Sequence, residues 1–393
     1  MEKERLWNAN YVKIMTVNAL MYFAFYILTP LLPLYLADHF GAENDTIGIV
    51  LSGYTLVALF VRPFSGFLID SYDRRRVLMV CLALFFVFFG GYIAAGSLLM
   101  FTIVRTLHGG PFGAMSVADS TVAIDVLPSS RRNEGIGYYG LSTNFALAFG
   151  PMVDIWLYKL THDFSTLFWV AFFMSLLGLL VAGTIHIPTK TIVKNKSKLS
   201  LDRFFLTRGW LLAVNILMFG FCYGVLANYL AIYSQQRLGI TSGTGVYFAL
   251  LSLGLACSRL QGAKGLRQGR ITRNCGEGVL ISIVGYTLFA ACPSKAGYYL
   301  SALIIGLGNG HMYPAFLNMF ISVAHHNERG TANSSILTSW DLGFGIGILA
   351  GGLVSKAAGY AAAFWMVDAM QVAGAILFFA ATRRFFLKRQ LKE

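Results

Sequence analysis

Charged side chains are scarce in this chain. Only 12% of its 393 residues are Asp, Glu, Lys or Arg, and 56% are hydrophobic, with a mean hydropathy of +0.63. An ordinary soluble domain contains about 25% charged residues. The composition therefore excludes a soluble globular protein and predicts a polytopic membrane protein.

Several chemical motifs are also missing. The sequence contains no G-x-S-x-G, no H-E-x-x-H, no P-loop lysine motif and no carboxylate–histidine cluster in a loop, which makes a membrane enzyme or an ATPase an unfavourable interpretation. The five cysteines show no C-x-x-C spacing and are interpreted as small buried apolar residues. We therefore expect no enzymatic activity, no cofactor and no metal.

Twelve apolar stretches can each cross a bilayer core, which takes roughly 20 helical residues. The predicted spans are 12–36, 45–69, 76–97, 98–123, 135–159, 164–186, 209–235, 242–262, 276–294, 296–322, 332–356 and 360–382. Spans 3 and 4, and spans 9 and 10, are nearly continuous, so each pair is expected to form a tight helical hairpin.

The positive charges fix the expected orientation. Most of the 31 Lys and Arg residues lie in the N-terminal segment, the even-to-odd loops, the central loop and the C-terminal tail. By the positive-inside rule, both termini are predicted to be cytoplasmic, in a multi-pass protein of the cell (inner) membrane. The same asymmetry explains the net charge of +13 without nucleic-acid binding.

The second half of the chain repeats the first at a constant offset of 197 residues. Asn18 aligns with Asn215, and Gly150 with Gly347. The repeat predicts an N-terminal six-helix bundle (1–186), a basic cytoplasmic linker (187–208), a C-terminal six-helix bundle (209–382) and a basic cytoplasmic tail (383–393). An all-α integral membrane fold of twelve helices in two repeated bundles, with a site between them, is typical of a transporter.

The loop after span 2 carries Gly66, Asp70 and a basic cluster that begins at Arg74. This resembles the loop 2–3 signature of the major facilitator superfamily, although Ser71 and Asp73 depart from its pattern. The glycine permits close helix packing, and the aspartate can cap a facing helix or pair with a basic residue. The resemblance implies a gating motif of Gly66, Asp70 and Arg74, completed by a charge relay to Asp125.

The repeat places Arg267 at the position of Asp70. The acidic member of the motif is therefore expected to be absent from the second half, and cytoplasmic closure to be asymmetric. An ordinary positively charged loop is the alternative interpretation of the segment after span 2.

Span 4 carries Arg105, His108 and Gly109, which resemble the superfamily's fourth-helix pattern. Arg105 and His108 lie one turn apart, and Asp119 falls on roughly the same face about 21 Å further along. The resemblance places all three side chains near the substrate or the protons. The alternatives are a snorkelling arginine and an aspartate near the headgroups.

Span 5 contains Gly150-Pro151, which resembles the superfamily's antiporter motif, but Asp154-Ile155 replaces the usual glycine pair. A packing kink is the alternative. In span 11, Asp341 aligns with Asn144 and is predicted to lie near mid-membrane. It is our first candidate for a protonatable group, and a neutral aspartate bonded to a neighbouring helix is the alternative.

Other polar and aromatic residues lie in the spans that the resemblance places around a central cavity. His311 is expected to line the cavity or to be hydrogen-bonded within the bundle. Asn18 and Asn215 are expected to contact the substrate or to bridge the two halves. The aromatic candidates are Tyr22, Tyr26, Phe112, Tyr223 and Tyr313.

The resemblance covers nearly the whole chain and implies a secondary transporter that works by alternating access. The expected activity is proton-coupled export of a small, amphipathic molecule, because aromatic side chains offer apolar and π contact. The expected partners are the substrate, protons and the lipid bilayer, and we expect a monomer. The alternatives are an uptake symporter or facilitator of the same fold, or a nutrient sensor that does not transport.

Overall fold

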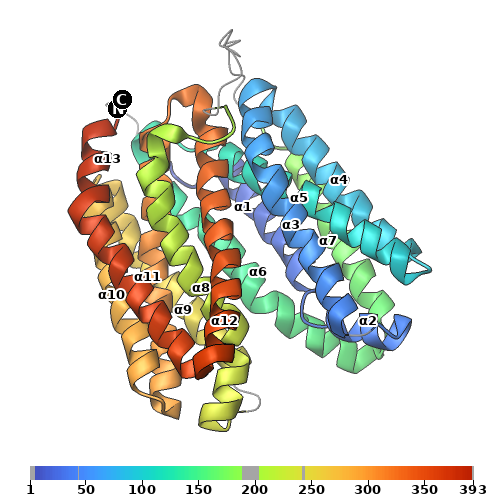
Figure 1. The fold of residues 1–393 in the computed structure, drawn as a ribbon. Helices are drawn as coiled ribbons and strands as arrows, with labels where there is room; N and C mark the ends of the chain where they lie inside the picture. Colours follow the sequence, from blue (N-terminus) through green and yellow to red (C-terminus); the bar gives the residue numbers. More distant parts are fainter. Residues whose placement is uncertain (1–4, 43, 188–202, 241–243, 392–393) are drawn as a thin grey trace. The chain divides into compact units, whose positions relative to one another are not determined.

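All regular structure in the part of the chain that the computed structural model describes is helical. The described residues are 5–42, 44–187, 203–240 and 244–391. Most of the predicted linker, residues 188–202, and the last two residues of the predicted tail lie outside them. Helix makes up most of the described part of each of the twelve predicted spans, so the all-α prediction is confirmed (Figure 1).

The helices follow the predicted spans closely. Two helices, α1 (Ala9–Tyr26) and α2 (Leu32–Phe40), take the place of the first span, and the next five spans are α3 (Asn44–Ser71), α4 (Arg74–Ala94), α5 (Leu98–Val126), α6 (Arg132–Thr161) and α7 (Phe164–Gly183). The second half contains α8 (Trp210–Leu238), α9 (Thr244–Arg267), α10 (Ile271–Ala291), α11 (Lys295–Ser322) and α12 (Arg329–Leu377).

The structure differs from the predicted spans at both ends of the chain. The first span is interrupted between Tyr26 and Leu32. The last two spans both belong to α12, which is kinked at Gly359, where φ is +84°. A π-helical turn, Phe378–Thr382, then leads into α13 (Arg383–Arg389), so the predicted tail begins as helix.

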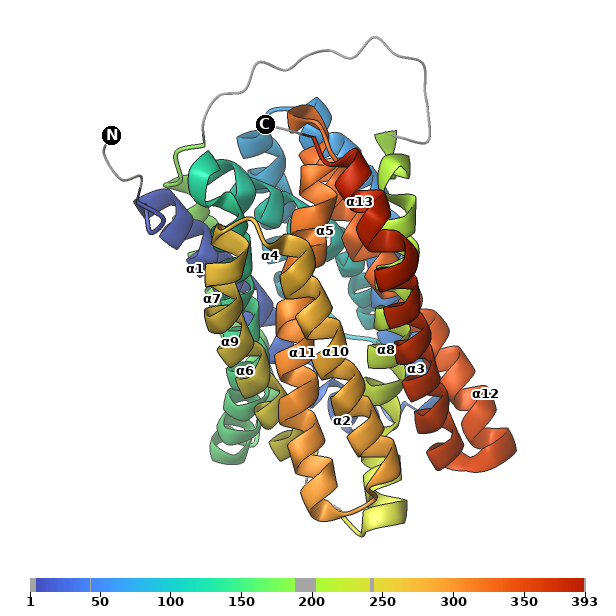
Figure 2. The ribbon, with the colours of Figure 1, turned by 90° about the vertical axis from the view of Figure 1, so that its left-hand side faces the viewer.

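Both tight hairpins are capped in the same way. Ser97 accepts a hydrogen bond from the N–H of Met100 at the start of α5, and Ser294 accepts one from Gly297 at the start of α11. The two serines are related by the repeat offset of 197 residues. A serine N-cap satisfies one of the free N–H groups of a helix start. The short connection lets α10 and α11 lie side by side, which both views show (Figure 2).

The chain divides into two compact units. Unit 1 comprises Met1–Arg132, Tyr139–Phe205 and Asn327–Ser334, and unit 2 comprises Asn133–Tyr138, Leu206–His326 and Ser335–Glu393. The first turns of α12 thus group with unit 1, and the first turns of α6 with unit 2.

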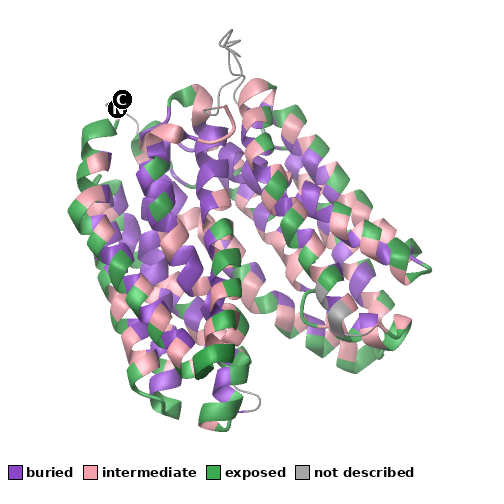
Figure 3. Cartoon of the chain, viewed as in Figure 1, coloured by how far each residue is buried: buried purple, intermediate pink, exposed green. Residues whose placement is uncertain are grey.

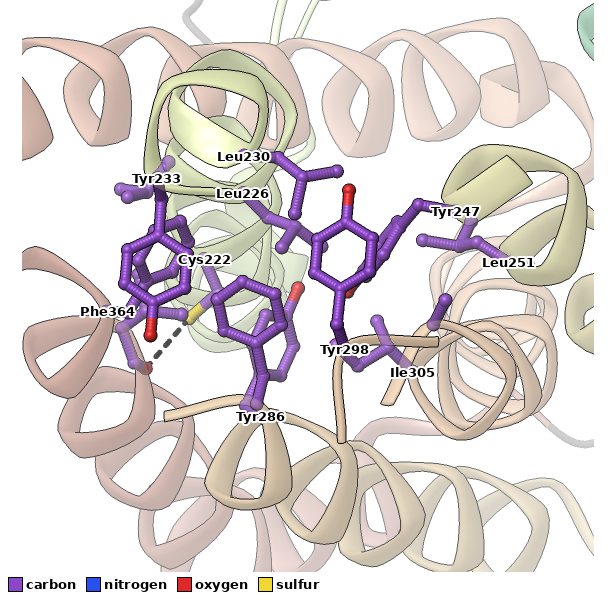
Figure 4. Packing of buried hydrophobic residues seen from close by; sticks show 14 of the residues in the cluster. Cys222, Leu226, Leu230, Tyr233, Tyr247, Leu251, Tyr286, Tyr298, Ile305 and Phe364 are labelled. Carbon is purple, nitrogen blue, oxygen red and sulfur yellow. Dashed lines mark hydrogen bonds between the residues drawn. The ribbon is translucent and has the colours of Figure 1, made fainter. Parts of the chain in front are cut away.

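Unit 2 has an aromatic core. The rings of Tyr233, Tyr298 and Phe364 pack around Phe289, with centroids 4.6–6.1 Å apart. Figure 4 shows this cluster with Cys222, whose thiol points toward the backbone carbonyl of Val367 at 3.5 Å. Ring contacts of this kind add to the free energy gained from burial alone.

The exposed surface of the helices is apolar. Figure 3 shows buried residues inside each group of helices and exposed residues on the outer faces. Large hydrophobic side chains are among the most exposed, including Phe60, Leu99, Leu349 and Leu353. Seven helical stretches of the described residues have both the length and the hydropathy of a membrane-crossing helix. α5, α6 and α11 are not among them, because glycine and polar residues lower their hydropathy. An apolar exterior of this extent is suited to lipid.

Candidate functional site

Asp70, in the last turn of α3, caps the first turn of α12. Its carboxylate accepts hydrogen bonds from the N–H of Gly330 at 2.9 Å and from the N–H and hydroxyl of Thr331 at 2.7 and 3.0 Å. The first N–H groups of a helix have no partner within it. The negative charge of Asp70 also faces the positive end of the α12 dipole. All three residues belong to unit 1, although 260 or more positions separate Asp70 from the other two.

Two arginines and a second carboxylate complete a buried cluster around Asp70. Arg74 donates to Asp70 at 3.2 Å and pairs with Asp125, while Arg329 donates to Asp125 at 3.3 Å. The side chains of Arg74 and Arg329 are only 6% and 3% exposed. Two positive and two negative groups balance, so little net charge is buried. Removing one member of such a cluster leaves a buried charge without its partner, which is strongly destabilising.

Close helix contact makes this geometry possible. A Cβ atom at Gly66 would lie 2.9 Å from the carbonyl oxygen of Gly330 and would collide with Ser334. A second contact joins α12 to α5. The Asn333 amide donates hydrogen bonds to the carbonyl of Val117 at 3.1 Å and to the hydroxyl of Ser120. The sequence motif identified Gly66 and Asp70 on α3, but it did not predict which residues of α12 they contact. Only the duplication of Arg132 as Arg329 in the repeat could have drawn attention to that segment.

The second half has an ion pair at the equivalent position. Arg267 lies 3.9 Å from Glu134, within unit 2. The repeat offset relates Arg267 to Asp70, and Glu134 to Thr331. Glu134 is buried, but Arg267 is 51% exposed. The acidic group therefore lies in the first turn of α6 and the basic group at the end of α9. The absence of an acid at position 267 leaves a weaker, solvent-accessible contact in place of a cap.

Arg105 lies in an aromatic cage within unit 1. Its guanidinium stands 4.1 Å from the ring centroid of Tyr54 and 5.8 Å from that of Phe25, and it donates to the Tyr92 hydroxyl at 3.3 Å. The side chain is 5% exposed. Aromatic faces attract a cation electrostatically, and arginine stacks on them readily. The structure therefore places Arg105 among the helices of unit 1.

His108 shares the same cage. Its Nδ1 lies 2.8 Å from the Tyr92 hydroxyl, and its ring packs against Phe85, Phe88 and Phe89. The Tyr92 hydroxyl accepts from Arg105 and also contacts the imidazole, so it links the two polar side chains of the cage.

Asn18, Asp119 and Tyr139 form a second polar network in unit 1. The Tyr139 hydroxyl lies 2.6 Å from Oδ2 of Asp119 and 2.9 Å from Oδ1 of Asn18. The Asn18 amide donates to Ser142 and Thr143, both at 2.7 Å. Asp119 and Asn18 are almost completely buried. The network joins α1, α5 and α6, so protein groups surround Asp119.

The polar candidates of unit 2 have different partners. Asn215, the repeat equivalent of Asn18, donates to the carbonyl of Gly374 at 2.9 Å, so the two amides are not equivalent. His311 lies 3.0 Å from the Oδ1 atom of Asn274, whose amide donates to the His311 carbonyl at 3.1 Å. Of the two expectations for His311, the structure has the hydrogen bond within the bundle.

The aromatic candidates form pairs within each unit. Tyr22 packs edge-on against Phe112 at 5.6 Å, and Phe112 stacks on Phe25 at 4.7 Å. In unit 2, Tyr313 packs edge-on against Trp340 at 5.4 Å. Asp341 follows Trp340 in α12 and is half-buried. The cage of Arg105 and the pair of Tyr22 and Phe112 thus lie in unit 1, and the pair of Tyr313 and Trp340 lies in unit 2. Sequence reasoning did not single out Tyr54, Tyr92 or Tyr139.

Gly150 and Pro151 lie where α6 meets the end of α1. A Cβ atom at Gly150 would come within 2.7 Å of the Cβ atom of Tyr26. The motif therefore packs on the last turn of the helix that ends at Tyr26. Among the described residues, no group of three or more His, Cys, Asp or Glu side chains has the arrangement of a metal site.

The fold and these sites define a membrane transporter of two repeated halves. The model of the Major Facilitator Superfamily matches residues 14–347, and the chain belongs to that superfamily. It is a secondary transporter and not an enzyme, and the superfamily resemblance of the sequence is confirmed.

Two curated relatives are similar to the chain at low identity. The quinolone resistance protein NorA of Staphylococcus aureus (strain MRSA252) is 23% identical over 239 residues, which cover 58% of this chain and 61% of that protein, less than two thirds of its length. The staphylopine export protein of S. aureus (strain Mu50) is 24% identical over 361 residues, covering 88% of this chain and 89% of that protein.

A solved structure shares the fold. The crystal structure of FucP, a superfamily transporter in the outward conformation, matches with a TM-score of 0.79 at 15% identity and covers 99% of this chain and 100% of that one. At this identity the likeness establishes the fold alone.

Proposed function

We propose that the protein exports a small, amphipathic molecule in exchange for protons. The bundles at 1–186 and 209–382 act as the two moving halves, and both termini face the cytoplasm. The names of two relatives, a quinolone resistance protein and a staphylopine export protein, support export. The glycine–proline motif of α6 supports it independently.

The contact of Asp70 with Gly330 and Thr331 carries the proposal. It joins the first half of the sequence to the start of α12 in the second half through three hydrogen bonds. Alternating access requires the halves to move against each other. A cap that holds α12 in one state and releases it in another biases the equilibrium between those states.

Arg105, His108, Asp119 and Asp341 are the proposed groups along the pathway of substrate and protons. The cage around Arg105 supplies a cation, aromatic faces and an imidazole in a site that is closed to water. Tyr22, Phe112 and Tyr313 are the proposed apolar contacts, and His311, Asn18 and Asn215 the proposed supporting polar groups. The burial of Arg105, His108 and Asp119 supports these roles.

An uptake symporter or facilitator is the second candidate. Asp154-Ile155 stands where the antiporter motif usually has a glycine pair, and this departure favours it. A sensor that does not transport is the third interpretation, and a flux measurement separates it from the other two.

The test is substrate-dependent proton movement in proteoliposomes with an imposed pH gradient. Amphipathic organic cations, sugars and small acids are screened, with Asp341→Asn beside the unchanged protein. Proton movement that opposes substrate movement is expected, and its loss in Asp341→Asn assigns the proton site. Flux in the direction of proton entry establishes symport, flux without proton movement establishes a facilitator, and binding without flux establishes a sensor.

A further inference from the structure

The hydroxyl group of Tyr139, on α6, lies between two oxygen atoms that both accept hydrogen bonds. It is 2.6 Å from Oδ2 of Asp119 on α5 and 2.9 Å from Oδ1 of Asn18 on α1. All three residues belong to unit 1. A hydroxyl group carries one hydrogen, so it can donate to only one of the two oxygens at a time. The other contact needs a hydrogen from a different group.

Asn18 cannot supply this hydrogen, because its amide orientation is fixed by two other contacts. Its nitrogen lies 2.7 Å from the hydroxyl oxygens of Ser142 and Thr143. The Ser142 hydroxyl gives its own hydrogen to the Tyr139 carbonyl at 2.5 Å, so toward Asn18 it can only accept. The Asn18 nitrogen must therefore face Ser142. The atom that faces the Tyr139 hydroxyl is then the amide oxygen, which carries no hydrogen.

A protonated Asp119 supplies the missing hydrogen. With a proton on Oδ2, the carboxyl group donates to the Tyr139 hydroxyl, which in turn donates to Asn18, so both contacts have their hydrogen. When Asp119 is ionised, Tyr139 must turn its hydrogen to the carboxylate. The buried oxygen of Asn18 then faces a hydroxyl oxygen without a hydrogen between them, which is unfavourable. The contacts in the structure thus match the protonated acid.

Among the described residues, no charged side chain acts on the carboxyl group of Asp119, and its Oδ1 atom is buried without a hydrogen-bond partner. Tyr11 and Tyr22 of α1 act electrostatically on Tyr139. The other titratable groups on α5 and on the helices packed against it are Tyr54, Arg62 and Asp70 on α3, Arg74 and Tyr92 on α4, Arg329 on α12, and Arg105, His108 and Asp125 on α5 itself. All of them except Arg62 belong to the Arg105 cage or the Asp70 cluster, and Arg62 forms no ion pair with Asp119. An ionised Asp119 would therefore be a buried charge without a counter-ion.

The second half of the repeat has no equivalent of this chain of hydrogen bonds. The offset of 197 residues places Phe316 at the position of Asp119 and Ile336 at that of Tyr139. Both side chains are fully buried. Apolar residues therefore pack well at these positions, and the repeated bundle does not need polar groups there. A buried acid within a membrane span is costly, so its presence in the first half points to a function.

We propose that Asp119 binds and releases a proton during the transport cycle, and that Tyr139 couples this proton to the contact with Asn18 on α1. The proton adds to Oδ2 of the carboxylate and leaves from the same oxygen, and no other covalent bond changes. Tyr139 donates to Asn18 while the proton is bound and turns to Asp119 when it leaves, which biases the packing of α1. The first half thus has a proton site besides the one proposed at Asp341. The role in transport rests on the proposed function, but proton binding is measurable without substrate.

The experiment uses the full-length protein in lipid nanodiscs. Infrared difference spectra between mildly acidic and alkaline pH detect the C=O stretch of a carboxyl group that gains a proton. We expect such a band in the unchanged protein and its loss in Asp119→Asn. Asp368→Asn is the matched control and should keep the band, because Asp368 is also buried and accepts from a hydroxyl group, that of Thr287, at 2.8 Å. A spectrum without the band, or a band that survives Asp119→Asn, overturns the proposal.

Two further variants test the coupling through Tyr139, and they also decide the matter if Asp119→Asn does not yield folded protein. Asn18→Ala removes the acceptor that competes with the carboxylate for the Tyr139 hydrogen, so the band should appear only at a lower pH. Tyr139→Phe removes the donor to the carboxylate, a charge-assisted bond that is stronger than a neutral one, so the band should appear already at a higher pH. Shifts in the same direction, or no shifts, overturn the proposal. A failed flux assay contradicts the proposed function and leaves this binding result intact.

Discussion

Asp70 and Thr331 are joined by two hydrogen bonds, at 2.7 and 3.0 Å, across 261 positions of the sequence. The repeat-related residues Arg267 and Glu134 are 3.9 Å apart. One contact is a buried helix cap and the other is a half-exposed ion pair. The two halves of the repeat therefore have contacts of different strength at equivalent positions.

We expect Asp70→Ala to abolish transport while folded protein remains in the membrane. The substitution leaves two N–H groups of α12 and one face of Arg74 without an acceptor, which costs roughly 3 kcal/mol for a buried charged partner. Vesicle flux and size-exclusion chromatography of the solubilised protein measure the two effects. Asp38→Ala is the control, because Asp38 is exposed. Flux equal to that of the unchanged protein would contradict a gating role for Asp70.

The contact of Arg267 with Glu134 is expected to contribute less to transport than the contact of Asp70 with Thr331. Arg267 is 51% exposed, and ion pairs that reach solvent contribute at most about 1 kcal/mol. Arg267→Ala should therefore reduce transport only partially, and high salt should reproduce part of its effect on the unchanged protein. Flux is measured for Arg267→Ala and Asp70→Ala at the same protein density. A greater loss of flux in Arg267→Ala than in Asp70→Ala would show that the contact of Arg267 matters more for transport than that of Asp70.

Gly66 is expected to tolerate no side chain. A methyl group there meets Ser334 and the Gly330 carbonyl, so Gly66→Ala must push α12 away from α3 and lengthen the hydrogen bonds to Asp70. Its flux should approach that of Asp70→Ala. Gly245→Ala is the matched control, because no heavy atom lies within 4 Å of the added Cβ. Equal flux in both alanine variants would show that close approach at Gly66 is not required.

The sequence was sufficient for the spans, the repeat and the α3 side of the Asp70 cluster, because hydropathy and short motifs are local properties. It did not reveal that Gly330, Thr331 and Asn333 are the partners, since these residues lie more than 200 positions away from the residues they contact. Nor did it reveal the break at Pro30, which the hydropathy of span 1 conceals. The networks around Arg105 and Asp119 depend on how each helix is rotated, and packing between helices sets that rotation.

Tyr139→Phe is expected to destabilise unit 1 by roughly 1–3 kcal/mol, the usual cost of leaving buried polar groups unsatisfied. It removes the donor shared by Asp119 and Asn18 while it preserves the ring. Thermal unfolding of the purified protein measures the change. Tyr158→Phe, in the same helix, is the control, because the Tyr158 ring packs on Phe164. Identical unfolding temperatures for the two variants would mean that the network contributes little to stability.

Arg105→Lys is expected to fold and to transport poorly. A guanidinium is planar, so it can stack on Tyr54 and donate to Tyr92 at the same time, whereas a compact ammonium group cannot do both. Tyr54→Phe keeps the aromatic face and should retain most of the activity. Tyr92→Phe removes the hydroxyl between Arg105 and His108 and should lower flux as Arg105→Lys does. Flux for the three variants, normalised to the amount of folded protein, separates the contributions. If Tyr54→Phe were as impaired as Arg105→Lys, a polar contact of the Tyr54 hydroxyl, and not the aromatic face, would position the arginine.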